Sequence, residues 1–167
     1  MAKKQDAITL LKEDHCKVED LFSQFEQATT PAQKRKIARR ICLELTVHTK
    51  IEEEIFYPAV KGKIQDDTVS EAYVEHDGAK VLIAEIEATD PENEYYDSKV
   101  HVLSEQIKHH VHEEEKFLRG MFSQSRRTDL DMDALGAQLQ ARKDELTKQY
   151  KKTLPKPELV SFSTVTL

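Results

Sequence analysis

The sequence contains few of the residues that build tight turns and crosslinks. Its 167 residues include 4 glycines, 5 prolines, 2 cysteines and no tryptophan. Few glycines and prolines leave few turns, which disfavours a fold of many short strands and favours long helices. The two cysteines, Cys16 and Cys42, both fall inside helical patterns, so we expect reduced packing thiols and no disulfide framework.

Long apolar runs are also missing. No stretch is long enough for a signal peptide or a transmembrane helix, which predicts a cytoplasmic protein with no membrane partner. The net charge is −6, and lysines and arginines are spread along the chain, so no nucleic-acid partner is expected. A chain of this length is long enough for one core and too short for two comfortable domains.

Apolar residues recur at three- and four-residue steps in five segments, which predicts five amphipathic helices. Their expected bounds are residues 6–27, 31–61, 67 to the break at 90–93, 94–123 and 131–151. We expect Thr30 and Asp67 to cap the second and third helices, with Pro31 in the first helical position of the second. Pro58 is expected to kink the last turn of the second helix or to end it there.

Four long helices joined by short loops predict an all-α fold, an up-down-up-down four-helix bundle. We expect the bundle to occupy residues 1–125, an additional C-terminal helix residues 126–151, and an extended tail residues 152–167. The additional helix would cover a bundle face or form a dimer contact, so a monomer and a homodimer both stay open. The tail would pack across the bundle or reach a partner.

Histidine spacing alone is weak evidence in this sequence, because five of the seven histidines are followed by glutamate four residues later. The useful test is whether each pair lies on a polar or an apolar helical face. His101, His109 and His112 lie on polar faces, which predicts solvated side chains. His110 and Glu114 instead interrupt an apolar stripe of the fourth helix. The apolar members of that stripe are Val100, Leu103, Ile107, Phe117, Leu118 and Met121.

Similar interruptions occur in all four bundle helices, and together they predict a metal site. The interrupting residues are His15, His48, Glu52, His76, His110 and Glu114. A single buried histidine is more often a hydrogen-bonded core residue than a ligand. Two ionised carboxylates buried at one depth, however, cost several kcal/mol unless a cation compensates them.

Four imidazoles and two carboxylates are too many ligands for one zinc ion. They suit two non-haem iron ions, joined by the two carboxylates and by a bridging oxide or hydroxide. This arrangement leaves room for an external ligand. Occupancy by zinc or manganese and a purely structural bundle are the lesser alternatives.

The segments that carry these residues resemble the hemerythrin-like, or HHE cation-binding, family. The matching segments are DHCKVEDLF (14–22), HTKIEEEIFYP (48–58), VEHDGAKVL (74–82) and HHVHEEEKFL (109–118), within about residues 6–123. The resemblance implies that the six residues named above are the metal ligands. Oxygen-carrying hemerythrins have a second histidine one turn after the position of His76, where this chain has Lys80, a poor ligand while it is charged. The open position would be filled by water, by Glu19 or Glu53, or by a substrate.

Two functions follow from the predicted site and the resemblance. The first is binding of, or reaction with, dioxygen, peroxide or nitric oxide at the iron pair, including peroxide disproportionation, with Lys80 or Tyr57 as a proton source. The second is a module that senses iron or oxygen, or binds them, without catalytic turnover, with the tail as its output element. The lysine at position 80 weakens the inference of simple reversible oxygen carriage.

Overall fold

The structure is a computed structural model, and it describes residues 5–163. Every regular element in that range is helical, so the prediction of an all-α fold is confirmed. The elements are α1 (Ala7–Gln27), α2 (Pro31–Ile51), η1 (Glu52–Phe56), α3 (Tyr57–Val60), α4 (Asp66–Ala88), α5 (Tyr96–Glu115), α6 (Met121–Ser125) and α7 (Met132–Tyr150). None of the helices between residues 5 and 163 combines the length and the apolar character needed to cross a membrane.

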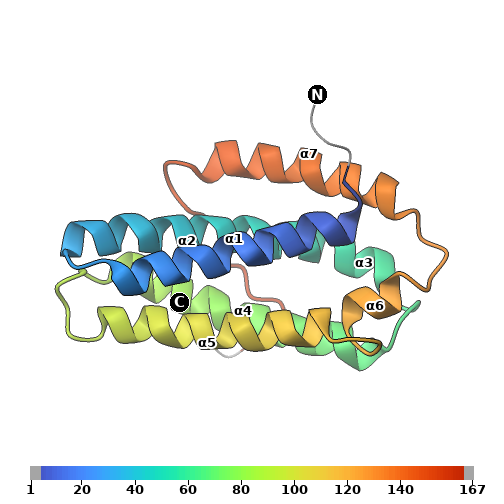
Figure 1. Ribbon diagram of the computed structural model, residues 1–167, viewed down its shortest axis with the longest axis horizontal. Helices are drawn as coiled ribbons and strands as arrows, with labels where there is room; N and C mark the ends of the chain where they lie inside the picture. Colours follow the sequence, from blue (N-terminus) through green and yellow to red (C-terminus); the bar gives the residue numbers. More distant parts are fainter. Residues whose placement is uncertain (1–4, 164–167) are drawn as a thin grey trace.

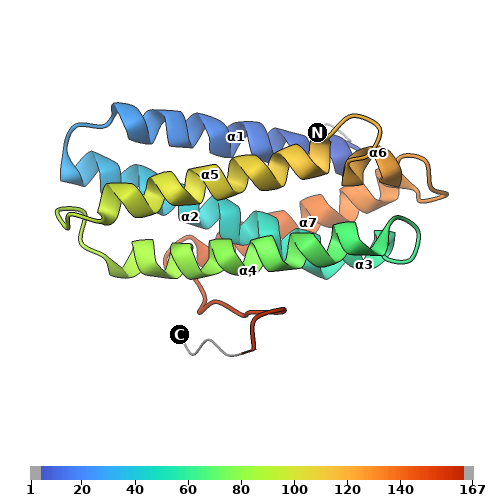
Figure 2. The ribbon, with the colours of Figure 1, turned by 90° about the horizontal axis from the view of Figure 1, so that it is seen from below.

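The four long helices α1, α2, α4 and α5 run along one another as a bundle (Figure 1). α1 packs on α2, and α4 packs on α5, as Figure 2 shows from the side of the second pair. α7, orange in Figure 1, lies across the outer side of α1 and α2. It buries Leu135, Leu139 and Leu146. The additional helix therefore covers a face of the bundle, which is the first of the two roles expected for it.

Side-chain caps fix the starts of the first two helices. Asp6 caps α1 and Thr30 caps α2, each by accepting the N–H of the third residue beyond it, at 2.9 and 3.2 Å. The predicted cap at Asp67 is wrong. α4 begins one residue earlier, at Asp66, and the Asp67 carboxylate accepts the N–H of Thr68 from within the first turn.

The second helix does not end at Pro58, which was one of the two alternatives. It widens into a π-helical turn over η1 and continues as α3 to Val60. In this turn the N–H of Tyr57 donates to the carbonyl of Glu52, five residues earlier. Pro58 follows directly, and its ring would crowd the carbonyl four residues earlier in a regular α-helix. Single turns of this kind are frequent at functional sites.

The fourth bundle helix is shorter than predicted. α5 ends at Glu115, and the chain turns back through Gly120 before α6 begins. A Cβ atom at Gly120 would lie 2.6 Å from the backbone oxygen of Glu114, so the turn requires glycine. The prediction that Phe117 and Leu118 lie on the buried stripe is wrong, because they are 84% and 58% exposed. The apolar periodicity continues through this turn and therefore predicted a longer helix. The turn itself depends on close backbone contact, which periodicity does not indicate.

The apolar core has two parts with a polar layer between them. The first part includes Leu11, Ile51, Ala72 and Met121, and the second includes Val18, Leu45, Ala79 and Leu103. α1 passes from the first part to the second at His15. α2 and α4 likewise change from one part to the other near His48 and His76. The histidines therefore lie at a common depth, where neither apolar cluster extends.

The two thiols are free and differ in burial. Cys42 packs in the second part of the core, as expected of a packing thiol. Cys16 is exposed, so the same prediction is wrong for that residue. Cys16 lies on the outer face of α1 because it directly follows a histidine that points inward.

Candidate metal centre

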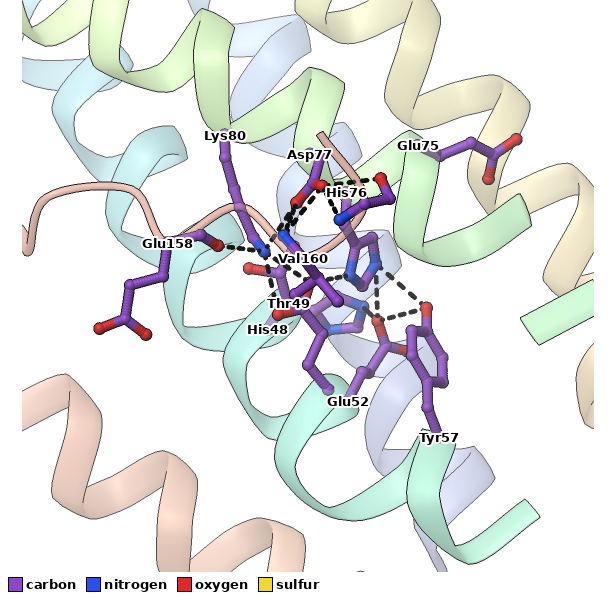
Figure 3. Close-up of polar contacts among 12 residues, drawn as sticks. His48, Thr49, Glu52, Tyr57, Glu75, His76, Asp77, Lys80, Glu158 and Val160 are labelled. Atoms are coloured by element: carbon purple, nitrogen blue, oxygen red, sulfur yellow. Dashed lines mark hydrogen bonds and ion pairs between the residues drawn. The ribbon is translucent and has the colours of Figure 1, made fainter. Parts of the chain in front are cut away.

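The six predicted ligand side chains converge in the polar layer. Each of them is at most 7% exposed. Glu52, in the π-helical turn, lies between two histidines from different helices. Its Oε2 atom is 3.2 Å from Nε2 of His48 and 3.3 Å from Nε2 of His76 (Figure 3).

The second glutamate has the same relation to the other two histidines. Glu114 Oε2 lies 3.4 Å from Nε2 of His15 and 3.5 Å from Nε2 of His110. The histidines also meet in pairs. The Nε2 atoms of His15 and His48 are 3.2 Å apart, and so are those of His76 and His110. Each glutamate therefore joins one histidine pair to the other.

The separation within each pair fits two nitrogens bound to one ion. Histidine–metal bonds of about 2.1 Å at roughly right angles place two nitrogens about 3 Å apart. The ligand atoms fall into two groups, within each of which they lie no more than 4.8 Å apart. The groups are His15, His48, Glu52 and Glu114, and Glu52, His76 and His110. The geometry thus offers two adjacent metal positions with Glu52 in common.

Two carboxylate oxygens of the layer lack a hydrogen bond. Among residues 5–163, Glu52 Oε1 and Glu114 Oε2 are buried without a hydrogen-bond partner. A buried oxygen without a hydrogen bond is costly, and a bound cation would satisfy these oxygens. Imidazole and carboxylate donors together suit iron, manganese or zinc. The residues present therefore fit a pair of metal ions by charge as well as by donor type.

The charges within the layer depend on one another. Burial alone would raise the pKa of Glu52, but His48 and His76 hold that pKa well below its usual value. Burial alone would lower the pKa of His76, but Glu52 and Glu53 raise it to about 9. Without metal, protonated imidazoles therefore neutralise the carboxylates. A bound metal ion would take the place of those protons, because metal ligands must be deprotonated to bind.

Each inward-facing histidine is held from behind by a carboxylate of a neighbouring helix. The contacts, all to Nδ1, are Glu115 Oε1 to His15 at 2.7 Å, Asp14 Oδ2 to His48 at 3.4 Å, Glu53 Oε1 to His76 at 3.1 Å, and Glu75 Oε2 to His110 at 2.7 Å. A carboxylate in this position fixes the orientation of the ring and leaves Nε2 free to bind metal. We call these four acids the outer carboxylates.

The sequence analysis predicted none of the outer carboxylates in this position behind a histidine. Glu53, one alternative for the open ligand position, lies instead on the outer side of His76. A signal was present, because each outer carboxylate is the chain neighbour of a predicted ligand. The pairs are Asp14–His15, Glu52–Glu53, Glu75–His76 and Glu114–Glu115. Neighbouring helical residues point about 100° apart, so one faces the core while the other faces the seam with the next helix.

Tyr57 lies inside the site. Its hydroxyl donates to Glu114 Oε1 at 2.9 Å and lies 3.1 Å from Nε2 of His76. It is also 3.3 Å from Glu52 Oε2 (Figure 3). The π-helical turn brings Tyr57 to the side of Glu52, whereas five residues of α-helix would rotate it about 140° away. Burial and the two glutamates raise the pKa of Tyr57 well above its usual value, so the hydroxyl keeps its proton.

Lys80, which stands where the oxygen carriers have a histidine, does not approach the ligand atoms. Its ammonium lies 2.9 Å from Glu53 Oε2 and 3.2 Å from Asp77 Oδ1, outside the layer. Glu19, another alternative for the open position, lines a cavity between α1 and α5. The structure thus gives Lys80 a place behind the outer carboxylate of His76.

Within residues 5–163, a small and a larger cavity reach the layer. A small one of about 10 Å³ touches all four inward histidines, and its apolar lining is Val18, Leu45, Ile107 and Val111. That volume is close to the space one water molecule needs. A larger cavity of about 660 Å³ lies between α1 and α5 and shares Ile107, Val111 and His15 with the small one. The two cavities meet at this pair of aliphatic side chains.

The other three histidines are exposed, as predicted. They are His101, His109 and His112. His109 still touches the site's surroundings, because its Nε2 lies 3.2 Å from Glu75 Oε1.

Comparison with known proteins places this chain in a family. The sequence pattern of the hemerythrin HHE cation binding domain matches residues 6–122. The chain therefore belongs to the hemerythrin HHE cation-binding family, and its buried histidine and glutamate groups make it a metal-binding helical bundle of that family.

Two individual proteins illustrate the relationship. A DNA nickase from Nostoc sp. is 32% identical over 114 residues, which are 68% of this chain and 32% of that protein. The chain thus spans about a third of the length of this relative. A solved structure of a hemerythrin HHE cation binding domain-containing protein from Mycobacterium kansasii has a TM-score of 0.73 and 19% identity, over 87% of this chain and 89% of that one. This second likeness supports the fold.

Proposed function

We propose that this protein holds two non-haem iron ions and that the iron pair binds or reacts with dioxygen, nitric oxide or peroxide. The proposed ligands are His15, His48, Glu52, His76, His110 and Glu114. The observation that carries the proposal is the apolar cavity of about 10 Å³ against both histidine pairs. Its volume admits one very small molecule and excludes organic substrates. A molecule there would lie beside both metal positions.

Peroxide disproportionation is the reaction that the site supports best. When bound, two adjacent irons supply Lewis acidity and a two-electron exchange, so that one peroxide is reduced to two waters and another is oxidised to dioxygen. The oxidation releases the two protons and two electrons that the reduction consumes. No external reductant or partner domain is therefore needed.

The chain's own residues orient the ligands and hold a proton. The outer carboxylates keep each Nε2 aimed into the layer. Tyr57, whose pKa lies well above its usual value, keeps a proton 2.9 Å from Glu114 Oε1. It can give that proton to an oxygen of peroxide, which becomes a strong base as it is reduced, and can take one back from the peroxide that is oxidised, which makes it the proton store of the site. Val18 and Leu45 keep bulk water away from the cavity.

The test combines metal analysis with oxygen evolution. Wild-type protein loaded with ferrous iron and freed of excess metal should retain two irons per chain and release oxygen from added peroxide. His110→Ala should lose iron and most of the oxygen release, because one nitrogen donor is gone. His101→Ala, an exposed histidine on the same helix, is the matched control and should behave as wild type. Equal iron content and equal rates in wild type and His110→Ala would remove the proposal.

A sensing or binding module without turnover is the second candidate. It is favoured by contacts between the outer carboxylates and the C-terminal part of the chain. Lys143 of α7 pairs with Asp14, and Lys80 contacts both Glu53 and the carbonyl of Glu158. Loss of metal would therefore disturb the C-terminal segment. Iron-dependent protease sensitivity of that segment, with no oxygen release from peroxide, would favour this function over the first.

The location and the partners of the protein are also expected from the sequence alone. A cytoplasmic location, a monomeric or homodimeric state and the absence of a nucleic-acid partner stay predictions. The relative from Nostoc sp. is named a DNA nickase, and this chain spans only 32% of it. Supercoiled plasmid mixed with iron-free protein should stay intact, because a net charge of −6 opposes binding to phosphates. Light scattering measures the oligomeric state.

A further inference from the structure

The segment that follows α7 crosses the bundle and lies against α4. We call residues 152–163 the strap. Figure 2 shows it passing from the end of α7 to the outer side of α4. It contains no regular secondary structure. Polar contacts hold it along its length: Arg39 donates to the carbonyl of Lys152, and Lys50 lies 2.7 Å from Glu158.

The end of the strap closes over the carboxylate of Asp77. That carboxylate accepts the backbone N–H groups of Val160, Ser161 and Phe162 and the hydroxyl of Ser161, the last at 2.7 Å. Asp77 is fully buried in this position. A buried carboxylate needs several donors, and consecutive backbone N–H groups provide them. The strap is therefore what allows a charged Asp77 to remain inside.

Lys80 connects this anchor to the metal centre. Its ammonium donates to the carbonyl of Glu158 in the strap at 2.9 Å and to Asp77 at 3.2 Å (Figure 3). It also donates to Glu53 at 2.9 Å. Glu53 is the outer carboxylate of His76, 3.1 Å from Nδ1. An unbroken chain of polar contacts therefore runs from the strap through Lys80 and Glu53 to a proposed metal ligand.

We propose that the strap is a positioning element of the metal centre: by satisfying Asp77 and holding Lys80, it keeps Glu53 in place behind His76. The inference rests on the proposed iron function. If the strap were released, Asp77 would lose its donors and would compete with Glu53 for the ammonium of Lys80. Glu53 would then lose its fixed place, and the ring of His76 with it.

A cavity under the strap adds a second effect. It measures about 450 Å³ and lies between the strap and helices α2 and α4. Glu53 and Lys80 line its inner side, and Leu154 and Pro155 belong to its outer wall. With the strap in place, this space beside Glu53 is partly covered. Without the strap, Glu53 would be more exposed to water, and its hydrogen bond to the imidazole would weaken.

Release of the strap should affect the two proposed metal positions unequally. The strap's contacts lead to His76, which belongs to the group with Glu52 and His110. The outer carboxylate of His48 is Asp14, and its lysine partner is Lys143 in α7, not a strap residue. Release of the strap should therefore loosen one ion more than the other, which a general loss of stability would not do.

The experiment measures release of ferrous iron from the full-length protein to an excess of a coloured ferrous chelator without oxygen. Asp77→Asn removes the charge that holds the strap, and should speed the release of one of two ions about tenfold or more, as expected when outer contacts of a ligand are lost. Ser161→Ala removes a single hydroxyl contact, and should speed the same ion by a smaller factor. Ser163→Ala, an exposed serine two residues along the strap, is the matched control and should leave both rates unchanged.

Each outcome bears on the proposal. Unchanged release in both Asp77→Asn and Ser161→Ala would overturn it, and so would equal acceleration of both ions. If Asp77→Asn does not fold, the comparison of Ser161→Ala with Ser163→Ala decides alone. Wild-type protein that binds no iron would overturn the proposed function and the strap's role with it. Iron binding that does not depend on the strap would overturn the strap's role alone.

Discussion

Removal of metal should lower the thermal stability of this protein by a large and measurable amount. The two parts of the apolar core meet at a layer of six buried side chains, which are the proposed metal ligands. A bound ion would compensate the charge of the carboxylates there, whereas in the metal-free protein protonated histidines compensate it. The perturbation is a strong chelator, followed by its removal.

Two estimates of the magnitude agree. An ion present at about 100 times its dissociation constant stabilises the folded state by about 2.7 kcal/mol, so two such ions contribute about 5 kcal/mol. Independently, two buried carboxylate oxygens lack a hydrogen bond, and each costs about 1–3 kcal/mol when unsatisfied. For a chain of this size, 1 kcal/mol shifts the melting temperature by about 2–4 °C. The expected decrease is therefore about 10 °C or more.

The assay is thermal unfolding followed by circular dichroism, with iron content measured on the same samples. Wild-type protein and His101→Ala should show the full decrease after chelation and recover after iron is restored. His110→Ala should melt low from the start and respond less to chelator. A wild-type midpoint that stays within about 2 °C after verified loss of metal would refute the reasoning.

Three further predictions concern single residues. Tyr57→Phe should destabilise the metal-free protein by about 1.5–3 kcal/mol in urea unfolding, because the buried carboxylate of Glu114 loses a hydrogen-bond donor. It should also slow oxygen release about tenfold or more, and an unchanged rate would contradict the role of Tyr57 as proton store. Asp6→Ala should cost about 1 kcal/mol at pH 7, while Asp67→Ala, which removes no cap, should stay within about 0.5 kcal/mol of wild type. Burial alone would raise the pKa of Asp6, but hydrogen bonds from the third residue beyond it lower that pKa below 3.8. Its contribution is therefore present above about pH 4 and disappears as the pH falls through the lowered value, so the two proteins should converge in stability in acid. Gly136→Ala should lower the free energy of unfolding in urea by about 1–3 kcal/mol, because the new methyl would lie 2.8 Å from the backbone nitrogen of Ala7. Gly78→Ala has its nearest neighbouring atom at 3.6 Å and should be neutral or slightly stabilising in the same measurement.

Much of the bundle could be predicted because helical periodicity indicates which residues of each helix face the core. His15 and His76 interrupt apolar stripes, and the structure places both at the level where the two core parts meet. Periodicity does not indicate backbone contacts, so it predicted that the fourth helix continues through Phe117. In the structure the helix ends at Glu115, before a turn that depends on Gly120. It also gave no warning of the π-helical turn, which moves Tyr57 to the side of Glu52.

The surroundings of the site were harder to predict than the convergence of the proposed ligand side chains. Asp14 and Glu75 look like ordinary surface acids in the sequence, because a residue beside an inward-facing histidine points out of the core. Their contacts depend on which helix lies next to which, and periodicity within one helix does not contain that information. The strap shows the same limit, since its place depends on Asp77, 83 or more residues earlier in the chain.

The order of the outer carboxylates and the ligands beside them records the handedness of the bundle. The acid precedes its neighbouring ligand in α1 and α4 and follows it in the second and fourth bundle helices, which run the other way. Every α-helix is right-handed, so moving one residue along it rotates the side chain by about 100° in a fixed sense. Moving one residue toward the N-terminus in one helix therefore rotates the side chain in the same sense, seen along the bundle axis, as moving one residue toward the C-terminus in an antiparallel helix. Each acid therefore reaches the helix on the same side, from α1 to α2, from the second helix to α4, from α4 to α5 and from α5 back to α1. A bundle of the same four helices wound in the mirror order would turn all four acids away from the histidines they serve.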